Sequence, residues 1–211
     1  MPYLSNMEKI ETIILDLGGV LLNISFEATE KAFESIGLTN FHQYFSQYKA
    51  SPLFEQLETG VVSEQEFYSY FRKETKLQVD DEAITKAWNA MLLDFPPERI
   101  EWLRGLEDRY RVFLFSNTNS IHHEAFQLKF SAEFPGKPFD LHFEKAYYSH
   151  ILGKRKPYID AFQALISDAG INPATTVFID DTKTNVEAAE KAGMKGIFLT
   201  NGQTVLELGL G

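Results

Sequence analysis

The feature that most constrains the fold is an apolar stretch from Ile13 to Leu22, with the sequence IILDLGGVLL. Branched apolar residues without polar alternation are typical of a strand that is buried on both faces of a parallel sheet. Asp16 interrupts the stretch with a carboxylate that is costly to bury, and Gly18 and Gly19 then permit a tight turn. Because open α/β sheets bind ligands at the carboxyl edge of their strands, we expect Asp16 to be functional rather than only a turn-capping residue.

The composition narrows the possible functions. The chain has 211 residues, enough for one large domain or two small ones. Its formal net charge of −10 argues against nucleic-acid binding, which needs basic residues to neutralise phosphates. The absence of cysteine excludes disulfides and thiolate catalysis. With no signal peptide before the first apolar run and no apolar segment of membrane-spanning length, we expect no membrane association and a cytoplasmic protein; nothing indicates an oligomeric state.

After Leu22 the periodicity changes from strand-like to helical for roughly seventy residues. Ser63 and Glu66 have the spacing of a capping box, and Asp80 is typical of the start of another helix. Aromatic residues recur at helical spacing through this region and are most simply the core of a helical bundle. The first such group is Phe41, Tyr44, Phe45 and Tyr48.

From Arg111 onward, apolar strand-like runs alternate with helical segments, which predicts βαβ units and a parallel sheet. The main strands are expected at RVFLFSN, which ends in Ser116-Asn117, and at TTVFIDD, which ends in Asp180-Asp181. The predicted fold class is α/β, a Rossmann-like parallel sheet with a helical-bundle cap inserted after the first strand. We expect residues 1–22 and 97–211 to form the core domain and residues 23–96 the cap domain.

Polar residues with complementary chemistry end three of the predicted strands, at Asp16, Ser116-Asn117 and Asp180-Asp181. Carboxylates bind hard cations through oxygen, and a carboxylate can also act as a nucleophile. Lys156 precedes Pro157 at the start of a helix, where its charge would add to an anion site. Carboxylates, a cation, a lysine and hydroxyl donors are together what phosphoryl transfer requires.

These residues fall in four motifs, LDLGGVL, FLFSNTN, RKP and VFIDDTKTN. With these motifs in this order, the chain resembles the haloacid dehalogenase (HAD) superfamily, most of whose members are Mg²⁺-dependent phosphatases. The resemblance spans almost the whole chain, and the first motif is similar to that of a subgroup that includes sugar-1-phosphate phosphatases. It implies a phosphatase that binds Mg²⁺ and acts on a small phosphorylated metabolite, such as a sugar phosphate.

The resemblance also implies a role for each motif residue. Asp16 matches the nucleophile that forms an aspartyl-phosphate and also binds the metal, and Lys156 matches the lysine of the third motif. The remaining residues bind phosphate or metal, or support those that do: Ser116 and Asn117 for phosphate, Asp181 for Mg²⁺ with Asp180 in support, the backbone carbonyl of Gly18 as a further metal ligand, and Asn185 to orient the loop.

Position 18 departs from the family pattern. Most phosphatases of this family have an aspartate two residues after the nucleophile, whose carbonyl binds Mg²⁺ and whose side chain protonates the leaving group. Gly18 keeps the carbonyl but lacks the proton donor, and losing a general acid–base typically slows a reaction about 10²–10⁴-fold. Leaving groups that need little protonation, such as an anomeric oxygen or an acyl phosphate, would be affected least.

Two other functions stay open. A non-catalytic relative would bind a phosphorylated ligand without turnover, because Gly18 removes the acid. A 2-haloacid dehalogenase would not need the acid, since halide leaves without a proton; however, such enzymes use no metal, and Asp180-Asp181 is most simply an Mg²⁺ site.

Two smaller features complete the pattern. His122 and His123 follow the second motif and are expected at the surface, although they are also candidates for the missing acid. Glu58 and Gly60 lie on a cap turn that leans over the active site in relatives, and an ordinary turn explains them equally well.

Overall fold

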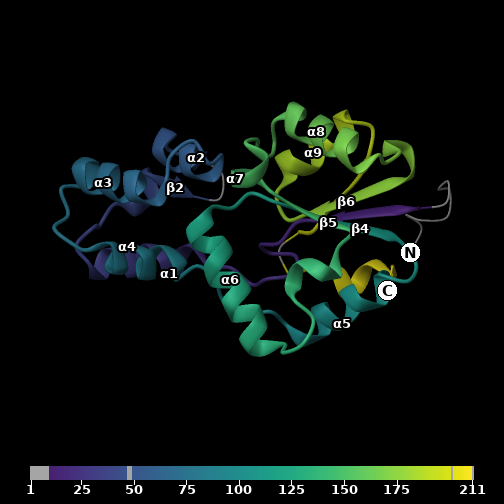
Figure 1. Ribbon diagram of the computed structural model, residues 1–211, viewed down its shortest axis with the longest axis horizontal. Helices are drawn as coiled ribbons and strands as arrows, with labels where there is room; N and C mark the ends of the chain where they lie inside the picture. The colour runs from purple at the N-terminus through teal and green to yellow at the C-terminus, as the bar shows by residue number, and fades with distance from the viewer. Residues whose placement is uncertain (1–9, 47–48, 201, 211) are drawn as a thin grey trace.

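The central feature of the computed structural model, which describes residues 10–46, 49–200 and 202–210, is a parallel five-stranded sheet with helices on both faces (Figure 1). The strand order is β5-β4-β1-β6-β7. The strands are β1 (Thr12–Leu15), β4 (Arg111–Ser116), β5 (Lys145–Tyr148), β6 (Thr176–Asp180) and β7 (Lys195–Phe198). One face is covered by α5 (Pro97–Leu106) and α6 (Ser120–Glu133), and the other by α7 (Ser149–Leu152), α8 (Ile159–Ala169) and α9 (Lys183–Lys191).

The position of β1 explains its apolar sequence. It lies between β4 and β6, and all four of its residues are buried. Ile13 and Leu15 pack with residues of α5 and α6, whereas Ile14 packs with residues of α8 and α9. A strand that is covered on both faces loses polar alternation, as the sequence analysis expected. The predicted α/β fold class is confirmed.

A helical cap lies beside the sheet and has a core of its own (Figure 1). Trp88 is fully buried at its centre, where its ring contacts those of Phe33, Phe45 and Phe54. The Ser63–Glu66 capping box is present with both of its hydrogen bonds. The cap consists of α1 (Phe26–Ser35), α2 (Pro52–Glu58), α3 (Glu64–Thr75), α4 (Asp81–Asn89) and the short strands β2 (Phe45–Ser46) and β3 (Lys49–Ala50).

The helical spacing after Phe41 does not produce a regular helix. The structure has a single 3₁₀ turn at Phe41–Gln43, followed by the antiparallel β2–β3 pair. Tertiary packing decides this region, because the rings of Phe41 and Phe45 both contact Trp88 and Phe54. Tyr48, the last residue of the predicted stripe, lies outside the described residues.

Two chain segments join the cap to the core and run antiparallel to each other. Ile24 pairs with Leu92 in a β-bridge, and the Asn23 N–H donates to the Asp94 carbonyl at 2.9 Å. The helices and strands of the cap lie between these crossings, while the domain boundaries after residues 22 and 96 stay predictions. Within the described part of the chain, no helix has the length and apolar character needed to cross a membrane.

Candidate active site

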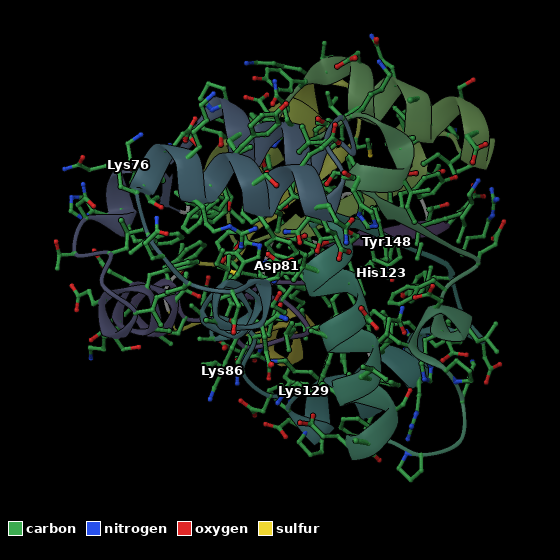
Figure 2. All side chains as sticks on the ribbon, turned by 60° about the vertical axis from the view of Figure 1, so that its left-hand side comes forward. Lys76, Asp81, Lys86, His123, Lys129 and Tyr148 are labelled. Atoms are coloured by element: carbon green, nitrogen blue, oxygen red, sulfur yellow. The ribbon has the colours of Figure 1, made fainter. Side chains whose placement is uncertain are left out.

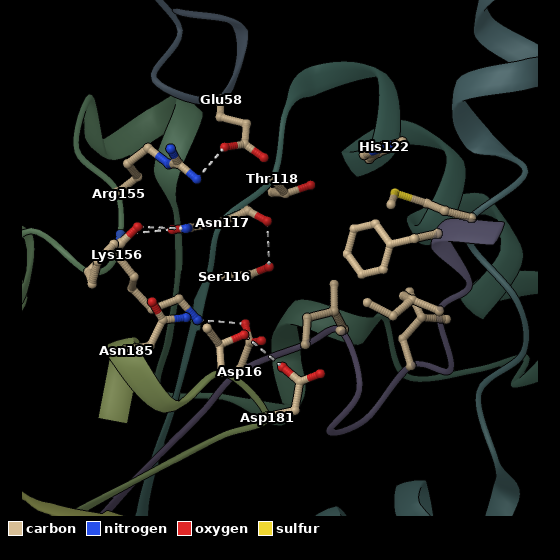
Figure 3. A pocket seen from close by; sticks show the side chains of 18 of the residues that line it. Asp16, Glu58, Ser116, Asn117, Thr118, His122, Arg155, Lys156, Asp181 and Asn185 are labelled. Carbon is tan, nitrogen blue, oxygen red and sulfur yellow. Dashed lines mark hydrogen bonds and ion pairs between the residues drawn. The ribbon is translucent and has the colours of Figure 1, made fainter. Parts of the chain in front are cut away.

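The carboxyl ends of three neighbouring strands bring the predicted residues together. Asp16 directly follows β1, Ser116 ends β4 and Asp180 ends β6. Asp16 and Ser116 lie at the floor of a cavity of about 490 Å³ between the core and the cap, and Asp180 is buried behind them. The motif residues that line this cavity are Asp16, Gly18, Ser116, Asn117, Lys156, Asp181 and Asn185, and Glu58 and His122 line it as well (Figure 3).

Lys156 is the central cation of this site. Its Nζ donates hydrogen bonds to Asp16 Oδ1 and to Asp180 Oδ2, each at 2.7 Å, and its side chain is only 1% exposed. Burial alone would lower the pKa of Lys156, but the two flanking carboxylates raise it, so the ammonium stays charged.

Asn117 fixes the backbone of Lys156 from the neighbouring loop. Its Oδ1 accepts from the Lys156 N–H and its Nδ2 donates to the Lys156 carbonyl, both at 2.9 Å. Both ends of the Asn117 amide are therefore engaged with Lys156. Ser116 ends β4 and lines the cavity beside Asn117. Phosphate binding by these two residues stays a prediction.

Three carboxylates gather beside Lys156. One oxygen each of Asp16, Asp180 and Asp181 lies within 4.8 Å of the others. Burial raises the pKa of Asp16 to about 7, and Asp180 and Asp181 add to this rise while Lys156 opposes it. Burial and Asp180 likewise raise the pKa of Asp181 to about 6. One ammonium does not balance three carboxylates, so the site has the charge and the oxygen donors that suit a divalent cation.

Asp180 and Asp181 differ in their surroundings, although they are adjacent in sequence. Asp180 is fully buried and accepts hydrogen bonds from Lys156, from the Thr182 N–H at 2.7 Å and from Asn185 Nδ2 at 3.0 Å. Asp181 instead lines the cavity. Asp180 therefore anchors Lys156 and the following loop, whereas Asp181 faces the space where a ligand would bind.

The two glycines after Asp16 meet different neighbours. Gly19 has a φ of +72°, and a Cβ at this position would lie 2.3 Å from Asp181 Oδ2, so glycine is required for both reasons. Gly18 has no positive φ, and a Cβ there would lie 3.1 Å from Ile24 Cδ1. Only the end of an apolar side chain restricts position 18.

The cap supplies acidic residues to the other wall of the cavity. Glu58, at the end of α2, is buried, and its Oε2 lies 3.0 Å from Nη2 of Arg155. Burial raises the pKa of Glu58, although Arg155 opposes this. One turn earlier, Glu55 accepts a hydrogen bond from the Tyr158 hydroxyl at 3.1 Å. The cap thus contacts the residues on both sides of Lys156 and Pro157.

The expected surface position of His122 is wrong. Its side chain is only 5% exposed because α6 packs against α4, and its ring stacks on that of Trp88 with centroids 4.4 Å apart. His122 also lines the cavity (Figure 3). His123 is half-buried and contacts the Tyr148 ring at 4.4 Å (Figure 2).

The sequence analysis did not assign Arg155, Thr118 or Tyr158 to the site, although all three line the cavity. The basic run Lys154-Arg155-Lys156 was the signal available for Arg155. Thr118 lies within the FLFSNTN motif and Tyr158 directly follows the RKP motif, so their closeness to predicted site residues was the signal available for them.

A capped acidic site thus lies at the carboxyl edge of a Rossmann-like sheet, and the family comparison assigns the chain to the hydrolases. The model of the haloacid dehalogenase-like hydrolase family matches residues 10–193. The chain therefore belongs to the haloacid dehalogenase-like hydrolases, in the phosphatase branch that the first motif indicated.

Relatives support this placement over nearly the full chain. A D-ribitol-5-phosphate phosphatase from Bacteroides thetaiotaomicron is 29% identical over 194 residues, which cover 92% of this chain and 93% of the relative. A HAD family enzyme from the same organism, crystallised with magnesium and inorganic phosphate, is 32% identical with a TM-score of 0.84, covering 95% of this chain and 99% of that one. A HAD-like family hydrolase from Porphyromonas gingivalis is 33% identical with a TM-score of 0.84, covering 93% and 94%.

Proposed function

We propose that this protein is a Mg²⁺-dependent phosphatase that hydrolyses the phosphomonoester of a sugar or sugar alcohol, with Asp16 as the nucleophile. The observation that carries the proposal is the position of Asp16, at the floor of the cavity with its Oδ1 2.7 Å from Lys156 Nζ. A buried carboxylate beside a fixed ammonium and two further carboxylates suits nucleophilic attack on a phosphate better than a structural role.

In the proposed reaction, an Asp16 oxygen forms a bond to phosphorus while the bond from phosphorus to the leaving oxygen breaks. Lys156 and Ser116 neutralise charge on the equatorial phosphate oxygens as the transition state forms. Gly18 has no proton to give, so the leaving oxygen takes its proton from water. Water then attacks the aspartyl-phosphate, which releases inorganic phosphate and restores the Asp16 carboxylate.

The oxygen donors of the site fit Mg²⁺. We assign Asp16, Asp181 and the Gly18 carbonyl as its ligands, with Asp180 in support. Burial first, and then the neighbouring carboxylates, raise the pKa values of Asp16 and Asp181, and a bound cation would stabilise their charged forms. When bound, the ion supplies positive charge that offsets the repulsion between the Asp16 carboxylate and a phosphate dianion.

The cavity size and the relatives support a small substrate. A volume of about 490 Å³ lies within the range of roughly 300–1,000 Å³ that is typical of small-molecule sites. The relative from Bacteroides thetaiotaomicron is named for D-ribitol 5-phosphate, which makes that compound the first substrate to test. The cytoplasmic location expected from the sequence stays a prediction.

Phosphate release tests the proposal. We expect the protein to release phosphate from D-ribitol 5-phosphate or from other members of a panel of sugar phosphates, nucleotides and acyl phosphates. Release should require Mg²⁺, stop with EDTA and disappear in Asp16→Asn. If no member of the panel is hydrolysed although phosphorylated ligands bind, the chain is a binding protein instead. Metal-independent halide release from 2-haloacids would assign it to the dehalogenases.

A further inference from the structure

The proposed function names the residues that would bind the phosphate, Asp16, Ser116 and Lys156. It does not say which residues contact the leaving group. Two buried acceptor atoms belong to residues that line this cavity, Nε2 of His122 and Oε2 of Glu58. Nε2 of His122 has no hydrogen-bond partner within the described part of the chain, whereas Oε2 of Glu58 lies 3.0 Å from Nη2 of Arg155. Leaving a buried polar atom without a partner is costly. A ligand that supplies a hydrogen-bond donor to Nε2 of His122 would remove that cost.

The surroundings of His122 determine which of its nitrogens carries a proton. Nδ1 lies 2.8 Å from Oδ1 of Asn89, and an amide oxygen only accepts hydrogen bonds. The proton is therefore on Nδ1, and Nε2 of the neutral ring carries a lone pair. Burial lowers the pKa of His122 to about 3, so the ring stays neutral at physiological pH. Stacking on Trp88 fixes the plane of the ring.

The same contacts exclude His122 as the missing acid. Its one N–H is donated to Asn89, so a leaving oxygen at Nε2 would find an acceptor and no proton. His122 lies across the cavity from Arg155 and Lys156 (Figure 3), and it reaches this position from the first turn of α6. It is thus a fixed acceptor on the cavity wall opposite Lys156.

We propose that His122 Nε2 accepts a hydrogen bond from a hydroxyl group of the leaving group, which makes His122 a specificity-determining residue. Glu58 lines the same cavity, and its Oε2 is paired with Nη2 of Arg155, so it leaves His122 Nε2 as the unpartnered acceptor. A leaving group that carries hydroxyl donors satisfies this atom. This inference rests on the proposed function and assigns the residue that recognises the hydroxyl groups of its substrate.

A pair of substrates with and without hydroxyl groups tests the inference. Pentitol 5-phosphate and n-pentyl phosphate have equal carbon chains, and we expect the wild type to prefer the pentitol by at least tenfold in kcat/KM. His122→Asn places an amide near the position of Nδ1, which keeps the contact with Asn89 but lacks an atom at Nε2. It should lower the preference roughly threefold to tenfold, as expected for one neutral hydrogen bond.

Two further variants separate recognition from packing. His122→Gln places an amide oxygen near the position of Nε2 and should retain more of the preference than His122→Asn. His123→Asn makes the same change one residue away, outside the cavity lining, and should leave the preference unchanged. If His122→Asn lowers kcat/KM for both substrates by the same factor, His122 has only a structural role and the inference is overturned.

A binding measurement distinguishes this failure from failure of the proposed function. The dissociation constants of both phosphates are measured by calorimetry on Asp16→Asn and on Asp16→Asn combined with His122→Asn. A preference for the pentitol that His122→Asn removes supports the inference even if the wild type turns over neither compound. An equal affinity for the two phosphates in both proteins overturns it, whatever the turnover shows.

Discussion

Replacement of Lys156 by methionine tests the charge balance of the site most directly. Methionine fills a similar volume but removes the ammonium that lies 2.7 Å from both Asp16 and Asp180. Because Lys156 is only 1% exposed, water does not replace the lost charge. Removing one partner of a buried ion pair typically costs about 3–5 kcal/mol, and two carboxylates lose their partner here, so we expect a loss near 5 kcal/mol.

This loss is measurable as a change in melting temperature. For a domain of this size, each kcal/mol lowers Tm by about 2–4 °C, so Lys156→Met should melt roughly 10–20 °C below the wild type in EDTA. Thermal unfolding followed by circular dichroism measures the difference. Phosphate release should also be lost, since the variant lacks the group that binds the equatorial phosphate oxygens.

Mg²⁺ should partly restore the stability of this variant. Three carboxylates against one ammonium give a formal charge of −2, which becomes −3 when Lys156 is lost. The more negative site of Lys156→Met should bind Mg²⁺ more tightly, and a ligand stabilises the folded state more when it binds more tightly. Saturating Mg²⁺ should therefore raise the Tm of Lys156→Met more than that of the wild type. Adding Asp181→Asn should reduce this gain. A variant as stable as the wild type, or an equal gain from Mg²⁺ in both proteins, would refute the reasoning.

Two further predictions concern Gly18 and His122. Gly18→Asp supplies a proton donor, and its Cβ requires Ile24 Cδ1, 3.1 Å away, to shift slightly. We expect kcat/KM for an alkyl phosphate to rise, by up to about 10²-fold, but little change for p-nitrophenyl phosphate. An equal rise for both substrates would contradict a role as acid. Burial lowers the pKa of His122 to about 3, so below its ordinary value of 6.5 the unfolded chain binds a proton there that the folded chain does not. Folding stability therefore decreases as pH falls, by about 2 kcal/mol between pH 7 and pH 5. In urea titrations the stability advantage of the wild type over His122→Asn should shrink by this amount at pH 5, and an unchanged advantage would show that His122 is protonated equally in both states.

The meeting of Asp16, Ser116 and Asp180 at one edge of the sheet was predictable, because local sequence patterns determine where each of them lies. A run of branched apolar residues forms a strand buried on both faces, and parallel strands place their carboxyl ends at one edge. Asp16, Ser116 and Asp180 therefore meet whatever the cap does. The Ser63–Glu66 capping box was predictable for the same reason, since both of its hydrogen bonds form within a single helical turn.

Features that depend on contacts between distant segments were not predictable. His122 is buried because α6 packs against α4, and no periodicity in either helix indicates that contact. The different surroundings of Asp180 and Asp181 follow from where Lys156 and Asn185 arrive in the folded chain. The aromatic spacing after Phe41 was misleading, because contacts with Trp88 and Phe54 outweigh helical periodicity there.

The structure gives a physical reason for the absence of an acid at position 18. Gly19 must be glycine, since its φ and the closeness of Asp181 both require it, but the backbone makes no such demand at Gly18. Ile24 lies over Gly18 instead, and its pairing with Leu92 holds it in the segments that join cap and core. An apolar side chain from the cap junction thus lies where an acid would project. A larger side chain at position 18 must displace Ile24. Glycine at position 18 therefore allows Ile24 to pack at the junction between cap and core. Under the proposed function, discrimination among substrates then falls to the opposite wall, where His122 Nε2 offers an acceptor to the leaving group.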